Sequence, residues 1–159
     1  MTASYIPLER YKRKWIFNNH EIPVSEQEKR FIKPLTEKGS MQLWNRFISN
    51  KSNHSEQFTK GDWGARSNSW KKADTWQTAW DSQDNGLPLL IAEDINWPDE
   101  TCVYFAYDKY NLIETNWLTF KNNWKCFLFF DDGPLLFSSE QKQVIWFHQS
   151  GEFQLGHRG

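Results

Sequence analysis

The chain has 159 residues with a formal net charge of −1, and 17% of its residues are aromatic. This length suits one ordinary domain that can bury a core without disulfides or metals, and the small charge gives no long-range attraction to nucleic acid or anionic membranes. No secretory leader or membrane-spanning apolar stretch is evident, which predicts a cytoplasmic protein built as a single α+β domain over residues 1–159.

Near the start, four cations occur within five residues: Arg10, Lys12, Arg13 and Lys14. One hypothesis is that this basic patch contacts the phosphates of a nucleic acid. A short isolated cluster in a nearly neutral protein is more often a solvated lead-in to the first folded element. We therefore favour the structural interpretation and do not expect a nucleic-acid partner.

Two helices are predicted in the next segment. Ser25 and Glu28 form a capping box, so a helix should run over 25–33 and end before Pro34. A second helix should open at Ser40, and its apolar residues share one face: Leu43, Trp44, Phe47 and Ile48. Both helices are expected to pack on one face of a sheet.

Residues 50–86 are polar, yet four of the chain's ten tryptophans punctuate them: Trp63, Trp70, Trp76 and Trp80. A linker would carry no such rings, so we predict an irregular layer on the core, with a short helix over 74–81 capped by Asp74. The four tryptophans are our candidate partner-binding residues, and we expect Trp63 and Trp70 to be the most exposed. Alternatively, they are anchors that hold the layer down.

The last third alternates between strands and one helix. We predict a strand over 101–107, a helix capped by Thr115, and a strand over 126–130. Further strands should cover 135–137, 144–147 and 153–155, the last as an exposed edge that could form a homodimer across a two-fold axis. The result is a mixed or antiparallel sheet of about five strands.

Cys102 and Cys126 are expected to be buried, reduced and inert.

Three carboxylates are the candidate catalytic residues: Asp108, Asp131 and Asp132. If a parallel crossover joins the strands over 101–107 and 126–130, Asp108 and Asp131 reach the same sheet edge. There they could perform acid–base chemistry as a hydrolase or hold Mg²⁺. The competing interpretation is ordinary turn chemistry. No nucleotide-binding, zinc-protease or His/Cys ligand pattern occurs, so we expect no cofactor and no resident metal.

Several motifs resemble a gammaproteobacterial family known as domain of unknown function 2947. They are the runs over 5–17, 33–36, 61–63, 76–81 and 127–134. The resemblance covers nearly the whole chain and implies one complete cytosolic bacterial domain, but no activity. A weaker, purely architectural similarity connects the predicted fold to bacterial immunity and interaction domains.

The surplus of aromatic residues and the absence of a catalytic signature favour a non-enzymatic module that binds a protein partner. Its contacts would come from the tryptophan-bearing loops or from the acidic stretch over 93–114, which holds six acids and one lysine.

Overall fold

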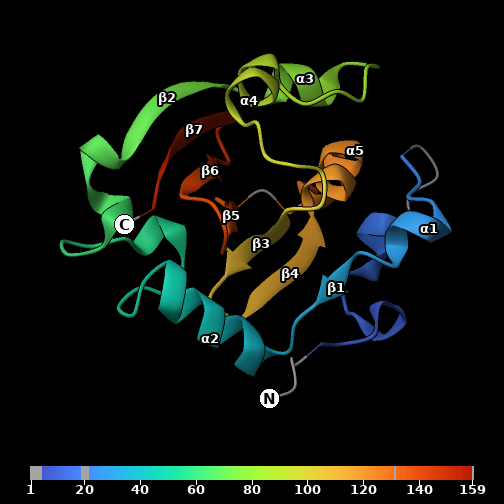
Figure 1. The fold of residues 1–159 in the computed structure, drawn as a ribbon, viewed down its shortest axis with the longest axis horizontal. Coiled ribbons are helices and arrows are strands. Elements are labelled where there is room, and N and C mark those ends of the chain that lie inside the picture. The colour runs from blue at the N-terminus through green and yellow to red at the C-terminus, as the bar shows by residue number, and fades with distance from the viewer. Residues whose placement is uncertain (1–4, 19–21, 131, 159) are drawn as a thin grey trace.

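The computed structural model describes residues 5–18, 22–130 and 132–158. Its centre is a seven-stranded sheet in the order β1-β4-β3-β5-β6-β7-β2, and every neighbouring pair is antiparallel (Figure 1). The strands are β1 (Lys33–Pro34), β2 (Trp70–Thr75), β3 (Cys102–Asp108), β4 (Asn111–Asn116), β5 (Leu135–Ser138), β6 (Gln143–Phe147) and β7 (Glu152–His157). The α+β class and the antiparallel alternative are confirmed, with more strands than expected.

Helical segments cover both faces of this sheet. The α-helices are α1 (Glu26–Lys29), α2 (Glu37–Phe47), α3 (Gln77–Asp81), α4 (Leu89–Asp94) and α5 (Trp117–Phe127). Short 3₁₀ turns are η1 (Leu8–Arg10), η2 (Lys14–Phe17), η3 (Ser55–Gln57), η4 (Trp63–Ala65) and η5 (Ser67–Ser69). Val103 and Phe105 of β3 join the cluster under α5, whereas Tyr104 and Ala106 join the one under α2. The expectation of helices mostly on one face is therefore wrong.

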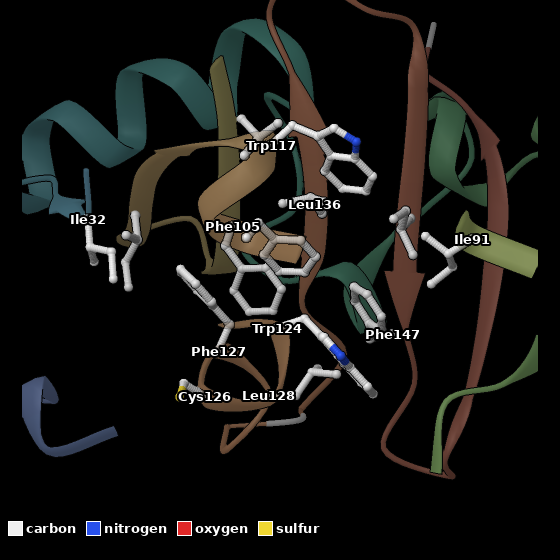
Figure 2. Close-up of a cluster of buried hydrophobic side chains, with 14 of the residues drawn as sticks. Ile32, Ile91, Phe105, Trp117, Trp124, Cys126, Phe127, Leu128, Leu136 and Phe147 are labelled. Carbon is white, nitrogen blue, oxygen red and sulfur yellow. The ribbon is translucent and has the colours of Figure 1, made fainter. Parts of the chain in front are cut away.

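The larger hydrophobic cluster is built from aromatic rings. Figure 2 shows the side chains of Phe105, Trp124, Phe127 and Phe147 gathered together, and all four are fully buried. The ring of Phe105 lies 5.3 Å from that of Phe127 and 5.6 Å from that of Phe120, centroid to centroid. Each buried ring stabilises the fold by roughly 1.5–3 kcal/mol, so this cluster fixes α5 on the sheet.

The first two helices differ from the prediction in their limits. Ser25 caps α1 by accepting a bond from the Glu28 amide at 3.1 Å, as predicted, but the helix ends at Lys29. Pro34 favours extended backbone at Lys33, and the chain instead forms β1 against β4. Helix α2 begins before Ser40 because Thr36 is its cap, accepting from the Gly39 amide at 3.1 Å. The predicted apolar face of α2 packs on the sheet as expected.

The centre of the last third is a hairpin and not a parallel crossover. Strand β4 follows β3 directly and pairs antiparallel with it, and Asn116, not Thr115, caps α5 by accepting from the Thr119 amide at 2.8 Å. The predicted strand over 126–130 is wrong, because Cys126 and Phe127 belong to α5. The apolar run is buried on several sides, and such a run fits a buried helix as well as a strand.

The middle segment contributes an unpredicted edge strand. Asp74 belongs to β2 rather than capping a helix, and α3 begins at Gln77 with Trp76 before it. Strand β2 pairs with β7, which therefore lies between β6 and β2. The expectation that the strand over 153–155 is an edge is wrong, so β7 has no free edge for the two-fold pairing considered from the sequence.

Candidate interaction surface

The four tryptophans of the middle segment are structural anchors. Trp63 is 9% exposed and Trp76 is buried, while Trp70 and Trp80 are half-buried. Each indole N–H donates to a backbone carbonyl: Trp63 to Phe47, Trp70 to Gly64, Trp76 to His148 and Trp80 to Lys125, at 2.9–3.3 Å. The expectation that Trp63 and Trp70 are exposed is wrong, because both pack against each other at 5.8 Å.

The exposed aromatic side chains come mainly from the N-terminal segment, which the sequence reasoning passed over. Trp15 is 54% exposed, Phe31 50% and Tyr5 39%. The signal that could have found them is the interleaving of rings with cations between residues 5 and 33. We call the following set the N-terminal surface: Tyr5, Arg10, Lys12, Lys14, Trp15, Arg30, Phe31 and Lys33.

The basic patch divides into cations with structural contacts and cations left at the surface. The guanidinium carbon of Arg13 lies 4.3 Å from the ring centroid of Phe130, and the Lys14 ammonium donates to the Glu9 carbonyl at 2.8 Å. Arg10 and Lys12 are exposed. Two cations of the patch therefore make structural contacts, as favoured from the sequence, and the other two are exposed to solvent.

An open cleft of about 810 Å³ separates two walls of the N-terminal region, residues 5–18 and residues 26–33. One end is tied by the Ile6 amide, which donates to the Pro34 carbonyl at 2.8 Å. The other end is tied by the Lys29 ammonium, which donates to Asn18 Oδ1 at 2.6 Å. Figure 1 shows these blue segments together at the β1 side of the sheet. The two ties hold the walls in place around the cleft.

Cations outnumber acids around this cleft. Lys14, Lys29, Arg30 and Lys33 line it, together with Glu9 and Glu26. Lys29 pairs with Glu26 at 3.0 Å, whereas the other three lining cations form no ion pair with any carboxylate of the described residues. Residues 5–18 and 22–33 carry seven cations and three acids, in a chain whose net charge is −1. The positive charge is therefore concentrated here.

The parallel crossover that was expected to bring Asp108 and Asp131 to one sheet edge does not form, because β3 and β4 pair as an antiparallel hairpin. Asp108 ends β3 and organises the following hairpin turn: Oδ1 accepts from the Tyr110 amide at 2.7 Å, and both oxygens accept from Asn111 Nδ2 at 2.9 Å. Asp132 is exposed, and Asp131 lies outside the described residues. The hydrogen bonds that Asp108 accepts are those of an ordinary Asx turn.

Three further acids in the stretch over 93–114 make contacts within the fold. Asp94 pairs with Lys72 at 2.6 Å, Asp99 pairs with Lys121 at 2.9 Å, and Glu114 accepts from the Tyr5 hydroxyl at 2.6 Å. These contacts tie loops and strands to one another.

Both thiols are poorly suited to nucleophilic chemistry. Burial raises the pKa of Cys126 to about 12, with the Glu28 carboxylate adding to the effect, and its Sγ donates to the Ile22 carbonyl at 3.2 Å. Burial also raises the pKa of the half-buried Cys102. Because the thiolate is the reactive form, the raised pKa values make both thiols less nucleophilic at neutral pH than an ordinary cysteine. The expectation that Cys102 is fully buried is wrong.

Within the described ranges, no group of three or more His, Cys, Asp or Glu side chains is arranged to hold a metal ion. The same residues include no helix of the length and hydropathy needed to cross a membrane. No curated protein and no solved structure is significantly similar to the chain. A family model described as "Protein of unknown function (DUF2947)" matches residues 5–156, and the chain belongs to that family.

Proposed function

We propose that this protein is a non-enzymatic binding module that engages a protein partner through the N-terminal surface. The observation that carries the proposal is Trp15, whose side chain is 54% exposed although the interior accepts many other rings. Tryptophan and arginine are enriched among the residues that dominate binding energy in protein interfaces. A solvent-facing indole is therefore the best-supported contact point.

Trp15 is held on a preformed base of aromatic rings. Its indole lies 5.9 Å from the ring of Phe129 and 5.5 Å from the ring of Phe130, and the guanidinium of Arg13 packs over Phe130. A side chain that is already supported loses little conformational freedom when a partner covers it. The free energy gained by burying the indole would then contribute to the binding affinity with little loss to side-chain entropy.

The proposal is tested by affinity capture from a lysate of the producing organism with full-length bait. We expect Trp15→Ala and Phe31→Ala to reduce capture of a specific protein by at least about tenfold each, as truncation of interface anchors does. Leu89→Ala is the matched control, since Leu89 is 72% exposed in α4 outside the N-terminal surface. Capture that is the same for all three variants contradicts the proposal.

Loss of capture must be separated from loss of folding. Trp15→Ala should lower the free energy of unfolding by about 0.5–1.5 kcal/mol, because it removes the ring contacts of a half-exposed side chain with Phe129 and Phe130. Trp63→Ala should cost about 3–5 kcal/mol, because it removes a buried indole and its bond to the Phe47 carbonyl. Urea unfolding followed by circular dichroism measures both. A Trp63 variant as stable as Trp15→Ala would mean that Trp63 is no anchor.

A further inference from the structure

We infer that the cleft between residues 5–18 and 26–33 binds a short segment of the partner in which acidic and apolar side chains alternate. This inference rests on the proposed function and adds the chemistry of the partner. It follows from the two hydrogen bonds that connect the walls, from the lining cations that form no ion pair among the described residues, and from the apolar side chains in the same lining.

The charge of the cleft selects for carboxylates. The ammonium groups of Lys14 and Lys33 and the guanidinium of Arg30 have no carboxylate neighbour within ion-pair distance among the described residues. The Lys33 ammonium lies 5.8 Å from the ring of Tyr5, and although Glu114 is its cross-strand neighbour, that carboxylate accepts from the Tyr5 hydroxyl and forms no ion pair with Lys33. Acidic groups of a ligand would supply the missing counter-charges and steer its approach.

The remaining lining selects for aliphatic side chains. Ile6, Leu8 and Ile32 also line the cleft; Ile6 and Leu8 are half-buried and Ile32 is buried. A volume of about 810 Å³ falls in the range of roughly 300–1,000 Å³ that is typical of binding clefts. Burying aliphatic groups there gains about 25 cal/mol per Å² of apolar area. A lining that combines cations with aliphatic side chains matches a peptide better than a chain of phosphates.

A nucleic acid fits the cleft less well. Glu9 and Glu26 are part of the lining, so a continuous phosphate backbone would meet two carboxylates. The net charge of −1 also provides no general attraction to a polyanion. A peptide can place apolar or uncharged residues opposite those two acids. The acidic peptide is therefore the ligand that the cleft favours.

The test is selection from a displayed library of random twelve-residue peptides on the immobilised full-length protein. We expect enriched sequences to combine Asp or Glu with Leu, Ile or Phe at alternating positions. A fluorescein-labelled peptide of the enriched sequence should bind in a fluorescence anisotropy titration. The double charge reversal R30E/K33E should weaken that binding by at least about tenfold, because two favourable contacts become repulsive.

A matched variant separates local from general charge effects. The double reversal K60E/K142E changes the net charge by the same amount at exposed positions that do not line the cleft. It should weaken peptide binding less than about twofold at physiological salt, where distant surface charges are largely screened. Equal weakening by the two double variants would overturn the inference.

Other outcomes are equally decisive. Selection of peptides without acidic residues, or no enrichment at all, overturns the inference. So does a labelled single-stranded oligouridylate that binds more tightly than the peptide and is released by R30E/K33E. If capture of a protein still depends on Trp15 and Phe31 while the peptide selection fails, the proposed function stands and only the acidic-segment inference falls.

Discussion

Tyr11 places a phenol hydroxyl in the interior, where it has no hydrogen-bond partner among the described residues. Burial raises the pKa of Tyr11 from 10.0 to about 12. The unfolded chain therefore ionises this phenol at a lower pH than the folded protein does, so the folded state loses stability as the pH rises from 10 through 12. Since one pKa unit corresponds to about 1.4 kcal/mol, a rise of about two units makes this loss on the order of 3 kcal/mol.

The variant Tyr11→Phe should remove this part of the alkaline destabilisation. We expect it to be as stable as the wild type or slightly more stable at pH 7, because it deletes a buried hydroxyl that has no hydrogen-bond partner among the described residues. Urea unfolding between pH 8 and 12 measures the slope. Tyr110→Phe, at an exposed position, should keep the wild-type slope. If the free energy of unfolding of Tyr11→Phe falls with pH as steeply as that of the wild type, the alkaline destabilisation is not due to Tyr11.

Hydrophobic periodicity in the sequence predicted the burial of individual side chains only within regular helices and strands. Trp44 was predicted to lie on the buried face of a helix from its spacing with Leu43, Phe47 and Ile48, and it is buried. Trp63 lies in a short 3₁₀ turn, where neighbouring residues follow no repeat that would indicate a buried face. Its burial depends on a carbonyl of α2 that is distant in sequence, and so could not be predicted.

The pairing of β2 with β7 depends on a glycine. Gly156 lies opposite Trp70, and a Cβ at this position would come within 2.1 Å of the Ser69 carbonyl oxygen and 2.7 Å of the Trp70 ring. We expect Gly156→Ala to lower the free energy of unfolding by about 1–3 kcal/mol, as overpacking does. Gly86→Ala is the control, since its Cβ would meet no atom closer than 3.5 Å.

This prediction is checked by the urea midpoint and by hydrogen exchange of the β2 and β7 amides. Loss of protection in β2 and β7, with the other strands unchanged, would locate the defect at the pairing of these strands. If the two glycine variants have the same midpoint, the close approach of the strands does not limit stability.

Among the elements, those with local signals were predicted and those defined by pairing were not. The capping box placed the start of α1, and the apolar run of β3 identified a central strand. Strands β1, β2 and β4 were missed because they are short or polar and become strands only through their neighbours. The prediction of a strand over 126–130 was wrong for a different reason. This run is apolar at every position, so it has no hydrophobic periodicity that would distinguish a helix from a strand.

The two hydrophobic clusters lie on opposite faces of the same sheet, so both depend on the same strands. Alternate residues of β3 enter opposite clusters: Phe105 the larger one and Tyr104 the smaller one. Unfolding either layer would expose one face of the same strand. We therefore expect two-state unfolding, with far-UV and near-UV circular dichroism transitions that coincide in urea. Two separated transitions would show that the layers fold independently.

The sequence by itself determined the α+β class, a sheet concentrated in the C-terminal half and the aromatic nature of the core, because apolar periodicity and composition are local properties. Only the tertiary structure decided which tryptophans are buried, that Asp108 is a turn residue and that four cations, Lys14, Lys29, Arg30 and Lys33, line one cleft. Those facts depend on contacts between residues far apart in the chain. Spacing along the sequence does not encode such contacts, and a candidate surface becomes visible only when the chain has folded.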